Sequence, residues 1–557
     1  MRTPKPINLG VSVIDRRVAR IRIFLRRLNK AAGNIQHAQV WAFAVAIGAA
    51  GAYGVIGLRE GIDAISMIAF GETEEALATG ARSIGVGRAW AAPVIGGVVV
   101  AALMYLASKF EWLPDGRGQG VSDVIEARAV SDGRVSWRAG LAAAAISTVS
   151  IGSGGSAGRE GPAIHLGATI ASILDGKFGF RAKDRRTLLG CGAAAAVAAS
   201  FNAPIAGVLF ALEVVMGNYA LSVFGPIAAA SVTAAIITRA NFGNFPAFEV
   251  PAYGLINTID VPLSALLGII CGLVATALLL SLERMTVSVR DYMHNRGLSI
   301  FILPPLGGVL IGLIGAFYPE VFGVGYEAVT KALRGDYALP LLAMLVIAKI
   351  AATAITLSFR FGGGVFSPGL VIGAFAGAAF GAVLGEISAL ETASPAFYAM
   401  IGMGAASGAI MGAPISTTLV VFELTGDYGM TISLMIAVAL ATLITQSIAG
   451  KSFFHWQLSR RGYDLSEGPQ GVILQTIRVR DVMEKMPPSA PLPKEADRLG
   501  LNGSLGQALA TLADLDVPGL PVVNSDNDAE VVGYLSRVKA LATYNRALIE
   551  SHVEHHK

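Results

Sequence analysis

Residues 158–162 read Gly158-Arg159-Glu160-Gly161-Pro162, and residues 364–368 read Gly364-Val365-Phe366-Ser367-Pro368. Each stretch stands directly before an apolar segment and combines glycines with a proline. Glycine lets a backbone approach a ligand closely, and proline suits the first turn of a helix, where its missing N–H has no partner to lose. Both stretches therefore predict helix N-termini that can receive a ligand.

A third stretch, Gly118-Gln119-Gly120-Val121-Ser122, has the same glycine-rich character. The free N–H groups in the first turn of a helix carry roughly half a positive charge, which makes a ready anion site. Several N-termini that converge at mid-membrane would hold an anion without a buried lysine or arginine, whose full charge would bind the ion too tightly to release it. The three stretches together predict an anion-conducting pore.

The two halves of the sequence repeat each other. Residues 161–168 match residues 367–374 at an offset of 206 (367 minus 161), and Ala203-Pro204-Ile205 matches Ala413-Pro414-Ile415 at an offset of 210 (413 minus 203). Many transporter folds are internally duplicated, and broken helices in corresponding positions mark their binding sites. The repeat therefore predicts a duplicated transporter fold.

Composition places the chain in a membrane. Of its 557 residues, 54% are hydrophobic and 15% are charged, whereas soluble domains average about 45–50% and about 25%. Long apolar stretches occupy residues 41–57, 91–107, 263–282, 299–318, 341–357 and 431–449. Shorter ones, such as 163–174 and 204–216, cannot cross a bilayer alone, and broken helices are tolerated at that depth only inside protein or along a water-filled cavity. We predict an all-α polytopic membrane protein with several broken or re-entrant helices.

Other classes of protein are disfavoured. The net charge of +4 is small and scattered, so nucleic acid is not an expected partner. Cys191 and Cys271 both lie in apolar stretches and form no disulfide framework. The apolar region contains neither an HExxH motif nor a close His/Asp cluster, so we expect no metal site, no cofactor for transport and no enzymatic activity.

The chain divides into three parts. Residues 1–34 predict a basic amphipathic helix on the cytoplasmic membrane face, with a solvated basic tail as the alternative. Residues 35–465 are predicted to form the anion-conducting membrane domain, with repeat halves at about 40–240 and 260–450. Residues 466–557 predict a cytoplasmic α/β module that follows a proline-rich loop, with helices at 504–513 and 538–548 and strands at 520–524 and 531–535.

The three glycine-rich stretches, Phe201-Asn202-Ala203-Pro204 and the repeat resemble the CLC family of chloride channels and chloride/proton exchangers over roughly residues 20–465. The resemblance implies about eighteen membrane helices in an inverted repeat. It also implies a homodimer with one chloride pore per subunit. From the positive-inside tendency of the basic N-terminus, we expect a multi-pass protein of the cell membrane with both termini in the cytoplasm. The implied anion site comprises Gly118, Gln119, Gly120, Arg159, Gly161, Gly364, Val365, Phe366 and Phe454.

Glu160 is the external gating glutamate by the same resemblance. A carboxylate at a helix N-terminus is stabilised by the helix dipole, and it would compete with an anion for the same N–H groups. It can therefore act as a gate that leaves when it is protonated or displaced. The alternative is an ordinary glutamate that only satisfies the end of its helix.

The C-terminal residues 479–483, 519–523 and 532–535 resemble a single CBS domain. Such domains usually occur in pairs that bind adenine nucleotides between them. The resemblance therefore implies a possible nucleotide site in this module and pairing of two modules across the dimer.

Three departures from the common CLC pattern bear on mechanism. Gln119 and Ser122 replace the usual small residue and proline of the first motif, and Phe454 stands where a tyrosine usually donates its hydroxyl to the central ion. Val214 occupies the position of the internal proton-relay glutamate of exchangers, and Glu213 lies about 100° around the helix from it. These departures favour a passive chloride channel. A chloride/proton antiporter is the alternative, because some members of the family exchange protons without that glutamate.

Several other residues allow two interpretations. Lys349 is either an anion-attracting charge near a vestibule or a snorkelling or internally paired lysine, and His165 is expected to be packed rather than a ligand. Glu423 is expected to cap or pair at a helix end. A basic cluster either draws anions to the pore or fixes the topology, and it consists of Lys177, Arg181, Lys183, Arg185 and Arg186.

Overall fold

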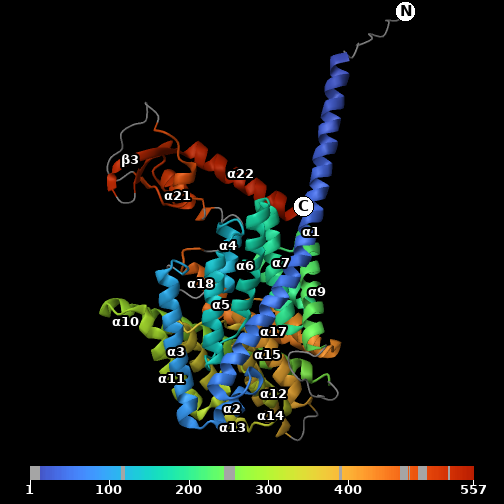
Figure 1. The fold of residues 1–557 in the computed structure, drawn as a ribbon, viewed down its shortest axis with the longest axis vertical. Coiled ribbons are helices and arrows are strands. Elements are labelled where there is room, and N and C mark those ends of the chain that lie inside the picture. Colours follow the sequence, from blue (N-terminus) through green and yellow to red (C-terminus); the bar gives the residue numbers. More distant parts are fainter. Residues whose placement is uncertain are drawn as a thin grey trace, which may run out of the picture.

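The computed structural model shows a helical bundle with a small α/β module beyond one of its ends (Figure 1). The structure describes residues 13–113, 120–243, 257–387, 392–463, 474–475, 477–486, 498–524 and 527–556. Gly118 and Gln119 lie outside the described residues, as does the predicted domain boundary at residues 465–466.

The first half of the bundle contains helices α1 to α9. Their bounds are α1 Val13–Phe70, α2 Leu77–Ser83, α3 Val86–Lys109, α4 Val121–Val130, α5 Trp137–Gly152, α6 Glu160–Phe178, α7 Ala182–Phe201, α8 Pro204–Phe210 and α9 Leu221–Phe242. A 3₁₀ turn, η1 (Glu74–Ala76), precedes α2, and a π-helical turn, η2 (Ala211–Met216), extends α8.

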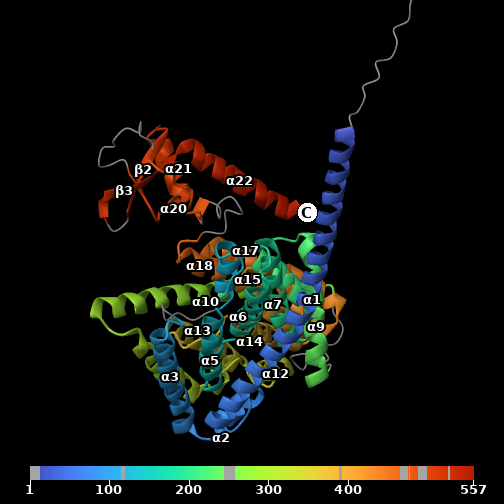
Figure 2. The ribbon, with the colours of Figure 1, turned by 45° about the horizontal axis from the view of Figure 1, so that its top comes forward.

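The second half contains helices α10 to α18. Their bounds are α10 Asp260–Arg296, α11 Leu303–Phe317, α12 Tyr326–Arg334, α13 Leu339–Ser358, α14 Phe366–Gly385, α15 Pro395–Met411, α16 Pro414–Thr425, α17 Tyr428–Ala449 and α18 Phe453–Ser459. Two 3₁₀ turns, η3 (Ile300–Ile302) and η4 (Pro319–Val321), flank α11. Figure 2 shows that α10 extends sideways out of the bundle.

Within the described residues, eight helical segments are long and apolar enough to cross a membrane. They are 38–70, 86–109, 221–242, 260–296, 300–317, 339–358, 366–385 and 428–459. The shorter apolar helices include 204–216, which the sequence also indicated, and 414–425. The prediction of a polytopic helical membrane protein is confirmed.

The two sequence repeats meet at the starts of α6 and α14. Gly158 and Gly364 exchange two backbone hydrogen bonds, each with an N–O distance of 2.8 Å, in an antiparallel bridge. These glycines are equivalent in the repeat, because 364 minus 158 is the same offset of 206. Equivalent residues that pair antiparallel run in opposite directions, as an inverted repeat requires.

Close helix crossings occur at corresponding places in both halves. A Cβ atom on Gly167 of α6 would lie 2.2 Å from the carbonyl oxygen of Gly192 of α7, and one on Gly373 of α14 would lie 2.1 Å from that of Gly402 of α15. Only glycine permits backbones to approach this closely, as it does in other membrane helix pairs. These crossings hold the two site-bearing helices, α6 and α14, against their neighbours.

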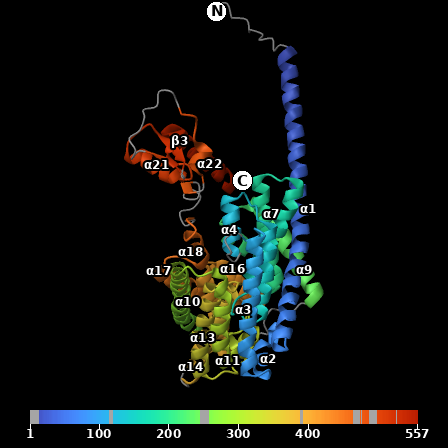
Figure 3. The ribbon, with the colours of Figure 1, turned by 60° about the vertical axis from the view of Figure 1, so that its left-hand side comes forward.

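The N-terminal segment differs from the prediction. Residues 13–34 are not a separate surface helix that ends at residue 34, because they continue without a break into the first span as part of α1. The basic pattern indicated a helix but not where it ends, since no proline interrupts the segment. This part of α1 leaves the bundle at the end where the C-terminal module lies (Figure 3).

The C-terminal module packs helices on a three-stranded sheet in the order β1-β2-β3, with β1 parallel and β3 antiparallel to β2. Its core includes Leu505, Leu512, Val522 and Leu535. The predicted helices and strands are confirmed, although β1 was missed because it is only two residues long. The bounds are α20 Val479–Val482, β1 Leu499–Gly500, α21 Leu505–Asp514, β2 Gly519–Asn524, β3 Asn527–Ser536 and α22 Arg537–His556.

Candidate functional site

The candidate site lies where α6 and α14 begin. The segment before α14 turns sharply at Gly362 and Gly363, whose φ angles of +105° and +106° suit glycine alone. A Cβ atom on Gly363 would also lie 2.4 Å from that of Ala157. This turn lets the two helices start side by side, so their positive N-terminal ends share one region of the bundle.

Glu160, the first residue of α6, points its carboxylate across to α14. Its side chain is buried, and its Oε1 accepts a hydrogen bond of 2.5 Å from Oγ of Ser367. The other oxygen, Oε2, has no hydrogen-bond partner among the described residues and lies against Gly158, where a Cβ atom would be 2.4 Å away. The first turn of α14 has no acidic residue of its own. Glu160 therefore supplies the negative charge at that helix end.

A cavity of about 730 Å³ reaches this carboxylate. It brings together Glu160 and the described residues of the expected anion site other than Arg159, namely Gly120, Gly161, Gly364, Val365, Phe366 and Phe454. The ring of Phe366 packs edge-on against Phe201 with a centroid distance of 5.0 Å. Aromatic rings thus border the cavity next to the helix N-termini.

At the third glycine-rich stretch, the N-terminus of α4 already has a carboxylate partner. The backbone N–H of Gly120, at the start of α4, donates to Oδ2 of Asp123 at 2.8 Å. Asp123 also pairs with Arg461, which follows α18. Ser122, which replaces the usual proline, donates to Gln457 of α18 at 2.6 Å. These bonds fasten α4 to the helix that carries Phe454.

The side chain of Arg159 turns away from the cavity. It donates to Oε2 of Glu74 at 2.9 Å and to the hydroxyl of Tyr326 at 3.1 Å, and all three side chains are buried. Arg159 is nevertheless the N-cap residue of α6. Its pairing therefore anchors the backbone that directly precedes Glu160.

Val214 packs against the apolar core, and its neighbour Glu213 caps a helix in the other half. Glu213 accepts hydrogen bonds from the backbone N–H groups of Ile415 (3.1 Å) and Ser416 (2.7 Å) at the start of α16. Glu423 caps α8 in return, through the N–H groups of residues 205 and 206 at 3.0 and 2.7 Å. The predicted capping role of Glu423 is confirmed. Glu213 also caps a helix, so its carboxylate has a structural role.

Lys349 is internally paired. Its side chain is fully buried, and its Nζ donates to the backbone carbonyls of Val321 at 2.9 Å and Gly323 at 3.0 Å. His165 is buried in α6, as expected, but its Nδ1 has no hydrogen-bond partner among the described residues.

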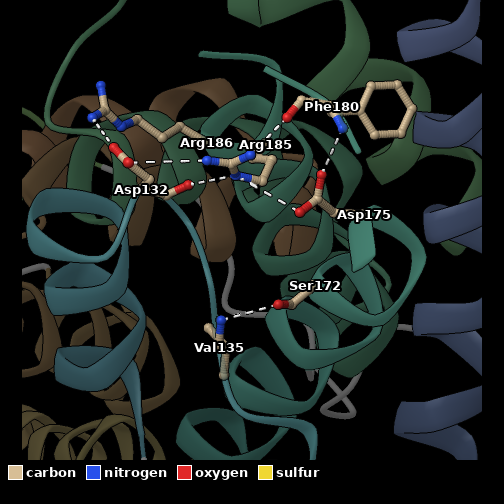
Figure 4. A network of polar contacts seen from close by, with 7 residues as sticks. All are labelled: Asp132, Val135, Ser172, Asp175, Phe180, Arg185 and Arg186. Atoms are coloured by element: carbon tan, nitrogen blue, oxygen red, sulfur yellow. Dashed lines mark hydrogen bonds and ion pairs between the residues drawn. The ribbon is translucent and has the colours of Figure 1, made fainter. Parts of the chain in front are cut away.

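The arginines of the basic cluster hold loops together (Figure 4). Arg185 donates to the carbonyls of Phe180 and Asp132, and Arg186 pairs with the carboxylate of Asp132 at 2.8 Å. Asp175 in turn accepts from the backbone of Phe180 at 3.0 Å. The loop between α4 and α5 is thereby tied to the turn between α6 and α7.

A family model described as voltage gated chloride channel matches residues 96–446, more than half of the chain. This chain belongs to the CLC family. It is 31% identical over 427 residues to a ClcB-like chloride channel protein of Ralstonia nicotianae, covering 76% of this chain and 97% of the relative. It is 28% identical over 416 residues to the voltage-gated ClC-type chloride channel ClcB of Escherichia coli, covering 74% and 96%.

Two solved CLC structures share the fold. A slow cyanobacterial Cl⁻/H⁺ antiporter has a TM-score of 0.65 at 22% identity, covering 76% of this chain and 97% of the antiporter. A CLC-type fluoride/proton antiporter has a TM-score of 0.61 at 22% identity, covering 74% and 96%. Membership of the CLC family makes this chain a polytopic membrane protein of anion transport and not an enzyme.

Proposed function

We propose that this CLC protein is a chloride channel in which the Glu160 carboxylate closes the pore. The observation that carries this proposal is the position of the carboxylate, which lies where α6 and α14 begin and lines the cavity. An anion attracted to the same helix ends would need the same place, so the carboxylate and the anion exclude each other. Chloride then passes when the carboxylate is protonated or displaced.

The anion site follows from the same geometry. We assign the main role to the backbone N–H groups of Val365 and Phe366, at the start of a helix that has no acidic residue of its own in its first turn. Gly120, Gly161, Gly364 and Phe454 complete the wall, and aromatic edges carry a weakly positive potential that tolerates an anion. Arg159 acts through the backbone of the α6 N-cap. Gly118 and Gln119 stay predictions.

Passive conduction is supported by the inner residues. Val214 cannot carry a proton, and Glu213 cannot replace a relay glutamate without leaving the N-terminus of α16. A proton that reaches Glu160 from outside therefore finds no titratable side chain at the internal relay position, Val214. Without such a relay, proton movement is not coupled to chloride movement.

Chloride/proton exchange is the second candidate, and His165 is the observation that favours it. Its buried imidazole lies on the same helix as Glu160, and its Nδ1 has no hydrogen-bond partner in the part of the chain that the structure describes. Asp123 and Arg461 act on it electrostatically. A proton route through His165 would avoid Val214. If this route operates, His165→Phe abolishes proton transport but leaves chloride transport intact.

The gate is tested by chloride flux from liposomes that contain Glu160→Ala. Loss of the carboxylate should raise flux at pH 7.5 by roughly tenfold, the equivalent of about 1.4 kcal/mol at a helix terminus, and remove its dependence on pH. Glu327→Gln is the matched control, because Glu327 also lies in the first turn of a helix but is paired with Thr79 and Lys331 away from the cavity. Equal behaviour of the two variants would make Glu160 an ordinary N-terminal glutamate.

The remaining features of the proposal concern assembly. We propose a homodimer with both termini in the cytoplasm and a CBS-type module that pairs with its copy. Exposed apolar side chains on α8, α9, α16 and α17 support a dimer contact between the two membrane domains. They include Ile205, Leu221, Ile415 and Met435. The mass of the purified protein in detergent tests the dimer, and calorimetric titration with ATP tests the nucleotide site.

A further inference from the structure

Ser367 is the side chain that donates a hydrogen bond to the carboxylate of Glu160. It is the second residue of α14, it is 1% exposed, and its hydroxyl lies 2.5 Å from Oε1 of Glu160, which is itself 2% exposed. The bond therefore joins two fully buried groups on different helices.

Ser367 does not use its hydroxyl within its own helix; like Ser122 and Ser416, it bonds a side chain of another helical segment. Ser407 and Thr418 donate to the carbonyl four residues earlier in their own helices. Ser367 stands too close to the start of α14 to find such a carbonyl within the helix. Its hydroxyl is directed across to α6 instead.

The bond also breaks the symmetry of the two repeats. At the offset of 206, Ser367 corresponds to Gly161, and Glu160 corresponds to Phe366. The first half supplies only the carboxylate and the second half only the hydroxyl. The pair at the starts of α6 and α14 therefore has no repeat-related counterpart at the corresponding positions Gly161 and Phe366.

We propose that Ser367 is a positioning residue that latches the Glu160 carboxylate in the pore and thereby sets how readily the pore opens. The inference rests on the proposed gating role of Glu160 and adds a second residue to it. To open, the carboxylate must give up the hydroxyl of Ser367, whether an anion displaces it or a proton neutralises it. Hydrogen bonds to an ionised group are stronger than those between neutral groups, so the hydroxyl stabilises the closed, ionised state more than the protonated one.

The direction of the effect follows from this preference. Removal of the hydroxyl weakens the closed state, so chloride flux at neutral pH rises. It also makes neutralisation of the carboxylate easier, so the external pH at which flux is half-maximal moves upward. A charge-assisted hydrogen bond is equivalent to about a tenfold change in the opening equilibrium, or about one pH unit in the midpoint.

The experiment measures chloride efflux from liposomes at a series of external pH values for Ser367→Ala, Ser367→Thr and the wild type. We expect the alanine variant to conduct about tenfold faster at pH 7.5, with its midpoint about one unit higher. The threonine variant keeps a hydroxyl and should restore wild-type behaviour. Size-exclusion profiles and melting temperatures show whether the variants are folded.

The same variants in a Glu160→Ala background separate the latch from the gate. If Ser367 acts only through Glu160, then Ser367→Ala changes nothing once the carboxylate is gone. An additional change in that background would mean that the hydroxyl acts on the anion directly, which overturns the latch. Unchanged flux in Ser367→Ala beside a pH-independent Glu160→Ala would also overturn the latch and leave the gate standing. A Glu160→Ala variant that behaves like the wild type would refute the gate, and the latch with it.

Discussion

Replacement of Gly373 by alanine should disturb the anion site although the residue lies far from it. A Cβ atom at this position would be 2.1 Å from the carbonyl oxygen of Gly402, whereas real Cβ contacts stay beyond 3.0 Å. Helices α14 and α15 must therefore separate by about 0.9 Å (3.0 minus 2.1) at the crossing, or shift along each other by a similar amount. Overpacking of this kind costs about 1–3 kcal/mol.

The displacement reaches the pore because α14 is a continuous helix. Gly373 lies seven residues after Phe366, or about 10 Å along the axis. A shift at the crossing therefore moves the N–H groups that we assign to the anion site. We expect both a lower melting temperature in detergent and a reduced chloride flux per reconstituted protein.

Gly385→Ala is the matched control, because it lies at the end of the same helix and its Cβ atom would meet nothing within 4 Å. Alanine is the better helix former, so this variant should be as stable as the wild type or slightly more stable. Gly167→Ala, at the equivalent crossing of α6 and α7, should behave like Gly373→Ala. Wild-type stability and flux in Gly373→Ala would refute the argument that close glycine packing positions the site.

Burial raises the pKa of Glu74, in the connection between the first two spans, to about 7 in spite of its arginine partner. This folded-state pKa lies above the ordinary 4.5, so the folded protein holds the proton of Glu74 more tightly than the unfolded chain does. The contribution of Glu74 to the free energy of unfolding is therefore largest below about pH 4.5 and declines as pH rises through about 7. Glu74→Gln should remove the decline between melts at pH 5 and pH 8, whereas Glu75→Gln, at an exposed ion pair, should keep it. Lys349→Met should lower the free energy of unfolding by about 1–3 kcal/mol, seen as a lower melting temperature, because two buried carbonyls lose their donor. Glu213→Ala and Glu423→Ala should each cost about 0.5–2 kcal/mol, since each leaves a helix of the other half uncapped, and a loss in only one of them would contradict the reciprocal capping.

The helix starts and the internal duplication could be predicted from sequence because their signals are local. Glycine and proline mark the beginnings of α6 and α14, and the repeat is visible as matching letters at one offset. Helix ends were harder to place. The apolar stretch 263–282 stops at Leu282, but α10 continues through charged, helix-compatible residues to Arg296 and ends at Gly297, which adopts a φ of +61°.

The contacts between distant residues could not be predicted. A serine after Phe366 has the same sequence pattern whether its hydroxyl bonds its own helix or the carboxylate of Glu160, which is 207 residues away. In the same way, nothing local connects Arg159 with Glu74 or decides whether Lys349 faces an anion or a carbonyl. These pairings depend on how the two halves fold against each other, which the order of residues within one helix does not specify.

The central claim is that Glu160 gates a passive chloride pore, and the reversal potential tests it most directly. The protein is reconstituted in a bilayer with a chloride gradient, and a pH gradient is imposed separately. If chloride moves alone, the potential follows the chloride gradient and does not change with the pH gradient. A shift of the reversal potential with pH would show that protons are carried in a fixed ratio to chloride, and would contradict the account of Val214 as the residue that uncouples them.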